Sequence, residues 1–253
     1  MKKIMGLSLL FITNVIIGQT IKYEKEKIKE METVLFEETF VSVNNKKTST
    51  IILKDGRSII GYFEDINRKK GQIKEVEVKD SVTGKVETFD ASKISELYLF
   101  PSGTEKFRKA MKNFTNIRSL SRKDHKKVID KETVFYKNQL VSLKNKKEQK
   151  EYLMQLINPT FNSSIEVYGD PNASETQAVA IGGMRMGGGV IKSYYIKKGE
   201  KMIWLHKDEF KETYNDLFGD NAEFMKSYPL DSVKWDYLSF LIYEYTRMNK
   251  ETK

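Results

Sequence analysis

Apolar and polar positions alternate through residues 48–100, which predicts a β-rich region. The expected strands run over residues 51–53, 59–63, 73–78, 86–89 and 94–99. Asp55-Gly56 between the first two is a strong two-residue hairpin signal. Gly61 inside the second strand indicates a bulge or a sharp bend, and Pro101 ends the last strand. Short strands joined by tight turns predict a small curved sheet or a barrel.

A second β-rich region is predicted between residues 134 and 205. Its expected strands run over residues 134–143, 152–157, 165–168, 178–181, 190–197 and 202–205. Asn158-Pro159 and Asp170-Pro171 are turn signals between these runs. Lys198-Gly199 lies between the last two runs and predicts a hairpin.

The apolar pattern changes to a helical period in the last part of the chain. One predicted helix carries Phe210, Tyr214, Leu217 and Phe218 on one face, and the last carries Leu238, Leu241, Ile242, Tyr245 and Met248. Gly219 ends the first helix. Asp220, followed three residues later by Glu223, predicts the N-cap of a short middle helix that Pro229 ends. These apolar stripes need a partner, and the preceding sheet supplies one.

The sequence therefore predicts an α+β protein with three parts after a signal peptide. Residues 1–18 are the expected signal peptide, and residues 19–103 form a small curved β-sheet or barrel-like domain. Residues 104–133 are the expected connector, and residues 134–253 form an antiparallel sheet packed with C-terminal helices. Ile28 and Met31, three residues apart, are consistent with a short amphipathic helix or with a solvated leader.

The first residues follow the secretory pattern. Two lysines, Lys2 and Lys3, precede an apolar run over residues 4–17, and the small residue Gly18 comes before Gln19. The run is shorter than the roughly 20 residues that span a bilayer. We expect cleavage between Gly18 and Gln19 and export to the periplasm, the cell surface or the medium, with no membrane-spanning segment left. The alternatives are an uncleaved anchor and a buried first strand.

Composition narrows the available chemistry. The chain contains no cysteine, which excludes a disulfide scaffold, a zinc–thiolate site and a cysteine nucleophile. Its two histidines, His125 and His206, leave little material for a metal site or a Ser-His-Asp triad. We therefore predict no cofactor and no metal. A hydrolase that uses two carboxylates stays open as the alternative, because such pairs meet only in space.

Positive charge is concentrated in the middle of the chain. The whole sequence has a net charge of +9, and residues 104–150 contain 15 Lys and Arg against 5 Asp and Glu. This excess favours an anionic partner or an anionic envelope surface, with Lys123, Lys126 and Lys127 as the expected contacts. Aromatic residues are sparse there, so we do not expect nucleic acid as the partner. The alternative is a solvated, lysine-rich surface.

The most conspicuous local motif is the glycine cluster at residues 182–189, which also contains Arg185. Glycines let backbone N–H groups approach a phosphate, and Arg185 is a candidate contact for an anionic partner. The spacing matches neither the phosphate-binding loop of nucleoside triphosphatases nor the dinucleotide fingerprint. We therefore interpret the cluster as a glycine-rich hairpin or strand with close backbone packing.

Two resemblances extend this interpretation. Residues 53–61, Leu-Lys-Asp-Gly-Arg-Ser-Ile-Ile-Gly, resemble the strand–turn–strand signature of Sm-like RNA-binding barrels, whose cytoplasmic role conflicts with the export pattern. The end of the signal at Gly18-Gln19, the segments 51–63, 89–100 and 193–199, and the helical pattern of residues 210–245 resemble exported proteins of Bacteroidetes, particularly of flavobacteria. That resemblance implies location and architecture, and it implies no activity or catalytic residue. We expect a non-enzymatic binding protein.

Overall fold

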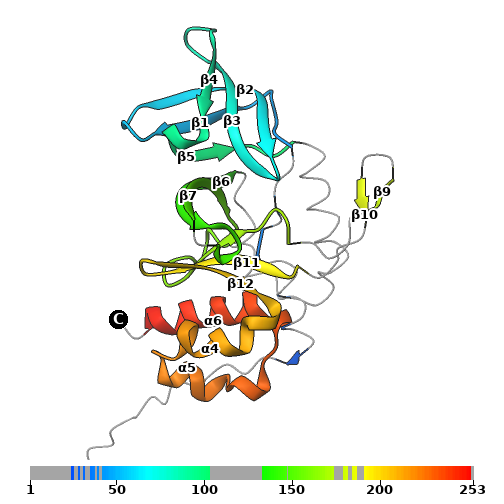
Figure 1. The fold of residues 1–253 in the computed structure, drawn as a ribbon, viewed down its shortest axis with the longest axis vertical. Helices are drawn as coiled ribbons and strands as arrows, with labels where there is room; N and C mark the ends of the chain where they lie inside the picture. The colour runs from blue at the N-terminus through cyan, green and yellow to red at the C-terminus, as the bar shows by residue number, and fades with distance from the viewer. Residues whose placement is uncertain are drawn as a thin grey trace, which may run out of the picture.

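The computed structural model describes most of the chain after residue 42. The described residues are 24, 25, 28, 31, 35–37, 39, 42–102, 133–146, 148–173, 179–181, 184–186 and 191–251. The expected signal peptide and the expected contacts Lys123, Lys126 and Lys127 lie outside these residues. Within the described residues, the protein is an α+β fold in which one sheet carries helices at one end (Figure 1).

Ten of the described strands form a single antiparallel sheet. Their order is β12 (Lys201–His206), β11 (Ser193–Lys198), β8 (Glu166–Gly169), β7 (Gln149–Leu156), β6 (Val134–Ser142), β5 (Ile94–Leu99), β1 (Thr48–Leu53), β2 (Ser58–Lys69), β3 (Gln72–Asp80) and β4 (Val86–Asp90). The remaining two, β9 (Val179–Ile181) and β10 (Met184–Met186), pair only with each other. The large sheet is open, with β4 and β12 at its edges, so the structure does not confirm a barrel at the N-terminal end.

The first five strands lie where the turn signals predict them. Gly56 has a φ of +87° in the β1–β2 turn, where Asp55 accepts a hydrogen bond from the Arg57 N–H at 3.0 Å. Gly61 is required by close packing, since a Cβ atom there would come within 2.4 Å of the Lys79 carbonyl oxygen. The pairing of β2 with β3 shifts register just beyond this position, between Phe63 and Asp65, which confirms the expected irregularity.

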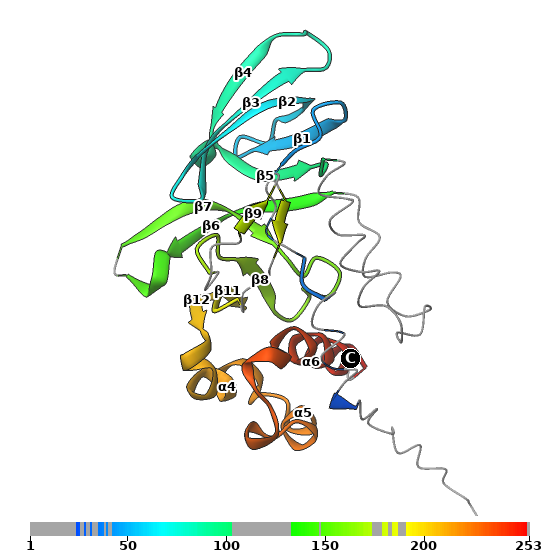
Figure 2. The ribbon, with the colours of Figure 1, turned by 90° about the vertical axis from the view of Figure 1, so that its right-hand side faces the viewer.

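The two predicted β regions are joined edge to edge in the same sheet. β5 pairs with β6 in a register that sets Leu97 opposite Tyr136 and Leu99 opposite Val134. Figure 2 shows β1 to β5 at one end of the molecule and the helices at the other, with β6 and β7 between them. Because Leu99 and Val134 are paired, the chain leaves and re-enters the sheet at neighbouring points.

This pairing predicts that residues 103–132 can be shortened. We expect a variant in which about six Gly and Ser residues replace them to keep the fold and a cooperative transition. Closing a shorter loop costs less conformational entropy, so the free energy of unfolding should stay equal or rise by about 1 kcal/mol. Urea titration followed by circular dichroism measures this change. A loss of more than about 2 kcal/mol would instead show that the segment packs against the sheet.

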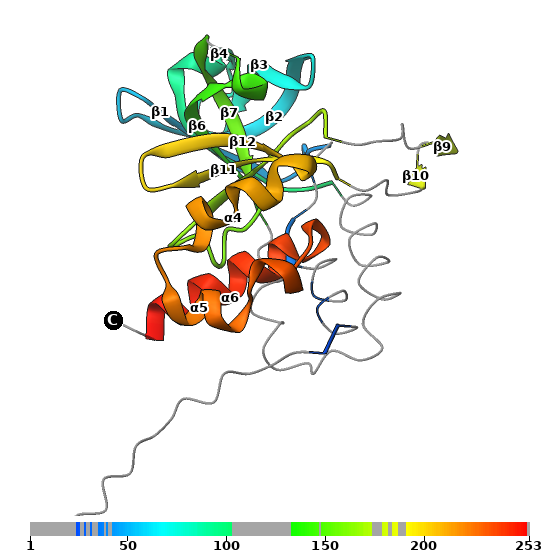
Figure 3. The same ribbon diagram turned by 60° about the horizontal axis from the view of Figure 1, so that its bottom comes forward.

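Three α-helices cover one face of the sheet beside β11 and β12 (Figure 3). They are α4 (Phe210–Phe218), α5 (Ala222–Ser227) and α6 (Leu238–Glu251), with short 3-10 turns η1 (Ala91–Lys93), η2 (Leu143–Asn145), η3 (Lys207–Glu209), η4 (Leu230–Ser232) and η5 (Trp235–Tyr237). The predicted apolar stripes form the buried faces of α4 and α6. The predicted N-cap at Asp220 is wrong, because Asn221 accepts the hydrogen bond from the Phe224 N–H at 2.9 Å.

Buried apolar side chains form three clusters. The largest lies between the helices and β8, β11 and β12, and it includes the buried side chains of Ile28, Met31 and Leu35. These residues have helical backbone, so they belong to the core and not to a solvated leader. The second cluster fills the concave side of β1 to β5, and the third lies on the opposite face around Tyr168 and Tyr195.

Candidate functional site

The structure places one of the predicted contact residues. Arg185 lies in β10 opposite Ala180 of β9, and its side chain is not among those described. Met184 pairs with Ile181, so β9 and β10 face each other across residues 182–183. This pairing confirms a hairpin at the start of the glycine cluster, and residues 187–189 lie outside the described residues. Strands and not a helix flank residues 182–183, so no helix N-terminus is presented to a phosphate at that point.

A small polar pocket, here named the Arg68 pocket, lies between the β2–β3 turn and strands β6, β7 and β8. Its volume is about 40 Å³. Its lining residues are Thr39, Arg68, Gly71, Gln72, Tyr136, Leu153, Met154, Gln155, Gly169 and Pro171. The register places Tyr136 opposite Gln155 on adjacent strands, so these two side chains share the face that the pocket occupies. None of the ten lining residues carries a carboxylate or an imidazole.

The charged group of the pocket is the half-buried Arg68 guanidinium. It donates to the Gly71 carbonyl oxygen and to the Tyr136 hydroxyl, both at 3.5 Å. These distances exceed the usual range of about 2.7–3.2 Å, so both bonds are weak. Among the residues that the structure describes, no carboxylate forms an ion pair with Arg68. The guanidinium therefore retains most of its capacity to donate to a ligand.

Gln72 brings a second polar group with no partner. Its residue is only 6% exposed, and its side-chain amide lines the pocket without a hydrogen bond to any described residue. Gln155 and Tyr136, each 4% exposed, add an amide and a hydroxyl to the same wall. The nitrogen and oxygen of the Gln72 amide are not among the fully buried polar atoms that lack a partner, so small molecules can reach them. Such a group is expected to be completed by water or by a ligand.

Two glycines bring the walls of the pocket together. Gly71 has a φ of +81° in the β2–β3 turn, and a Cβ atom there would come within 2.7 Å of the Pro171 ring. A Cβ atom at Gly169 would come within 2.7 Å of the Thr39 side chain. The turn is further tied to its neighbour by the Asn172 amide, which donates to the Lys70 carbonyl oxygen at 3.4 Å. The backbone around the pocket is thus closely packed and leaves room for a small group only.

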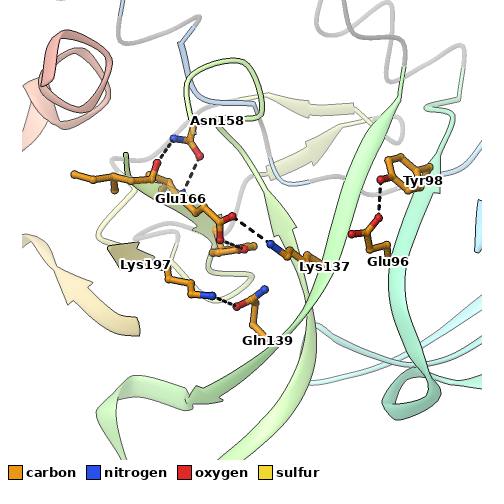
Figure 4. A network of polar contacts seen from close by, with 10 residues as sticks. Glu96, Tyr98, Lys137, Gln139, Asn158, Glu166 and Lys197 are labelled. Atoms are coloured by element: carbon orange, nitrogen blue, oxygen red, sulfur yellow. Dashed lines mark hydrogen bonds and ion pairs between the residues drawn. The ribbon is translucent and has the colours of Figure 1, made fainter. Parts of the chain in front are cut away.

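A separate polar network lies on the opposite face of the sheet (Figure 4). Glu166 accepts from Lys137 at 3.3 Å and from the Tyr168 hydroxyl at 2.6 Å. Nearby, Lys197 donates to Gln139 at 3.4 Å. Lys137 follows Tyr136 directly in β6, and successive strand residues point to opposite faces, so this network does not reach the Arg68 pocket. Lys137 and Glu166 form an ion pair and the other groups of the network bond to neutral partners, which is the pattern of a structural network.

Two tyrosines near this network have strongly raised pKa values. Burial, followed by hydrogen bonding to the Glu96 carboxylate, raises the pKa of Tyr98 to about 12. Burial also raises the pKa of Tyr168, and its hydrogen bond to Glu166 adds to the effect. Both phenols therefore stay protonated at neutral pH and act as hydrogen-bond donors to their carboxylates. Neither is set up to act as a base.

A serine, an aspartate and a histidine lie close together at the β11–β12 end of the sheet. Ser193 is paired with His206, and the Ser193 hydroxyl bonds to the Asp170 carboxylate at 2.8 Å. The Trp204 indole donates to the same carboxylate oxygen at 2.8 Å, while His206 Nδ1 lies 3.2 Å from Asp208. In a catalytic triad the imidazole accepts the serine proton and the aspartate orients the imidazole. Here the serine contacts the aspartate directly, so the arrangement is not a triad.

Comparison with known proteins finds no matching family model, no matching curated protein and no matching solved structure. Within the described residues, no group of three or more His, Cys, Asp or Glu side chains is placed to hold a metal ion. No helix of the described part of the chain is both long and apolar enough to cross a membrane. The Arg68 pocket is the candidate site that the described residues define best.

Proposed function

We propose that this chain is an exported, non-enzymatic binding protein of the cell envelope or the secreted fraction. The observation that carries the binding role is the Arg68 pocket, which offers a guanidinium and an amide without strong protein partners. None of the described residues that line this pocket carries the carboxylate or imidazole that would serve as a general base. The alternative of a carboxylate-dependent hydrolase needs two convergent acids in a pocket, and the described lining residues supply no such pair.

The proposed location rests on the residues before Thr20. Lys2 and Lys3, the apolar run over residues 4–17 and the small Gly18 form the pattern that export requires. Removal of residues 1–18 would leave Ile28, Met31 and Leu35 in the mature chain, where they complete the helical core. The proposed cleavage thus spares every described residue that packs into the fold. The resemblance to exported flavobacterial proteins agrees with this location.

Cell fractionation together with the intact mass of the native protein tests the proposal. We expect the protein in the periplasm, on the surface or in the medium, with a mass that begins at Gln19. The expected mature charge is +7, because cleavage removes Lys2 and Lys3 from the total of 44 basic residues and leaves 42 against 35 acids. A full-length cytoplasmic protein would contradict the proposed location and would direct attention to RNA binding by the residues that resemble Sm-like barrels.

The same fractions test the proposed role of the connector charge. Reversal of Lys123, Lys126 and Lys127 to glutamate should weaken association with the envelope, and the loss should be largest at low salt because exposed charges are screened at high salt. Reversal of the described surface residues Lys69, Lys70 and Lys85 makes a control of equal charge change. Equal association of both variants and the unaltered protein at every salt concentration would remove the connector from the interface.

A further inference from the structure

We propose that the Arg68 pocket binds a single carboxylate group. The proposal needs neither export nor the charged connector, and it concerns only residues that the structure describes. Three properties of the pocket carry it: an arginine without an acidic partner among the described residues, an amide that donates to none of them, and a volume that admits a small group. The three properties meet at one place in the fold.

Charge is the first argument. A guanidinium presents its N–H groups in a planar fork that matches the two oxygens of a carboxylate. Other cations of the sheet meet a carboxylate of this chain, such as Lys137 with Glu166 and Lys54 with Glu151. Arg68 has only a carbonyl and a hydroxyl at 3.5 Å. The missing partner of Arg68 is therefore one negative charge with planar, bidentate geometry.

Hydrogen bonding is the second argument. Gln72 follows Arg68 across the Lys70-Gly71 turn, so both side chains reach the pocket from one hairpin. The Gln72 amide carries two N–H donors, and neither donates to a described residue although the residue as a whole is only 6% exposed. A carboxylate held by Arg68 would accept a hydrogen bond from this amide. Water would satisfy the amide and would leave the guanidinium charge without its counterion.

Size is the third argument. The pocket volume of about 40 Å³ exceeds the roughly 30 Å³ that one water molecule occupies in the liquid. It is far smaller than the roughly 300 Å³ at which metabolite-sized pockets begin. The pocket thus accepts a terminal group and not a whole metabolite. A phosphate at neutral pH carries nearly two charges and would meet only one cation, so the pocket matches a carboxylate better.

Two sources of this group share the same chemistry, a free small acid and the end or side chain of a polypeptide. Titration of the full chain, with the N-terminus found in the intact-mass measurement, separates them. The side-chain N–H resonances of Arg68 and Gln72 are followed in ¹H–¹⁵N spectra and assigned with the variants Arg68→Gln and Gln72→Met. Sodium acetate, sodium chloride and acetamide are added in parallel, so that charge and shape are varied separately.

We expect acetate to shift the Arg68 and Gln72 resonances saturably, with half-saturation at about millimolar concentration, since so small a ligand binds weakly. Acetamide and chloride should leave them unchanged. Arg68→Gln should weaken acetate binding at least about tenfold, and Arg68→Lys should also weaken it because an ammonium lacks the planar fork. The matched control Arg57→Gln removes an exposed arginine that already pairs with Asp55 at 2.8 Å, so it should leave binding unchanged.

Titrations with peptides identify which molecule supplies the bound carboxylate. A pentapeptide with a free C-terminus is compared with its C-terminal amide, and with an amidated peptide that contains one glutamate. Tighter binding of the free C-terminus than of acetate assigns the pocket to a polypeptide end, and tighter binding of the glutamate peptide assigns it to an acidic side chain. Equal affinity for acetate assigns it to small acids. Equal shifts by acetate and acetamide, or full binding by Arg68→Gln, would overturn the proposal.

Discussion

Replacing Arg247 with methionine is expected to lower the free energy of unfolding by about 3–5 kcal/mol. Arg247 lies on α6 and holds the Glu244 carboxylate through two hydrogen bonds, of 3.1 Å from Nε and 2.8 Å from Nη2. Glu244 is completely buried, and it also accepts a hydrogen bond from the Tyr228 hydroxyl at 3.3 Å. Loss of the guanidinium would leave a carboxylate in the helical core without its counter-charge. Chemical unfolding followed by circular dichroism measures the change.

A double variant shows whether the buried charge is the cause. Glu244→Leu combined with Arg247→Met replaces the ion pair with apolar groups, and it should recover most of the stability that Arg247→Met loses. Arg57→Met is the matched control for the substitution itself, because Arg57 and Asp55 form an exposed pair in a turn. We expect that control to leave the melting temperature unchanged. If Arg247→Met and the double variant were equally destabilised, the loss would come from packing of the arginine stem.

The strand pattern of the N-terminal half could be predicted because its determinants are local. Asp55-Gly56 fixes the β1–β2 turn, and the close approach of Gly61 to Lys79 requires a glycine at that point. The junction of the two β regions could not be predicted in the same way. The pairing of Leu99 with Val134 joins strands separated by residues 103–132, and no turn signal marks a contact of that kind.

The C-terminal helices could be predicted from the helical spacing of their apolar residues. The N-cap of α5 could not be predicted in this way. Asp220 and Asn221 are neighbours of equal capping propensity, so the sequence cannot choose between them. In the structure, the Asp220 carboxylate accepts hydrogen bonds from Lys198 at 2.8 Å and from the Tyr245 hydroxyl at 2.7 Å. Burial alone would raise the pKa of Asp220, but these two bonds outweigh it and hold the pKa below its usual value. Because these tertiary contacts engage the Asp220 side chain, Asn221 is the residue that caps α5.

The Arg68 pocket could not be found from the sequence alone. Arg68 and Gln72 flank an ordinary turn, Lys70-Gly71, and each is one polar residue among many. Tyr136 and Gln155 come from strands far along the chain, and only the curl of the sheet brings them beside Arg68. The density of positive charge and the glycine cluster in the sequence instead led to the prediction that the anionic partner contacts Lys123, Lys126, Lys127 and Arg185. The lack of partners for Arg68 and Gln72 among the described residues becomes visible only in the three-dimensional structure.

Replacing Asp170 with asparagine is expected to lower the free energy of unfolding by about 2–3 kcal/mol. One carboxylate oxygen accepts from Ser193 and from the Trp204 indole at 2.8 Å each, and the other accepts from the Asn172 N–H at 2.9 Å. Asparagine has nearly the same shape but only one acceptor oxygen. In either orientation its NH₂ group faces an N–H donor, of Trp204 or of Asn172, and at least one half-buried donor contact is lost.

A double-mutant cycle attributes this loss to the indole contact. In the Trp204→Phe background, Asp170→Asn should be less destabilising by about 1–2 kcal/mol, because the indole N–H is already absent. Asp216→Asn is the matched control, since Asp216 pairs with Lys201 on the exposed surface and such pairs contribute about 0–1 kcal/mol. An additive cycle would instead mean that Asp170 acts mainly through Ser193 and the 170–172 turn. That result would matter for the Arg68 pocket, because Pro171 of the same turn forms part of its wall.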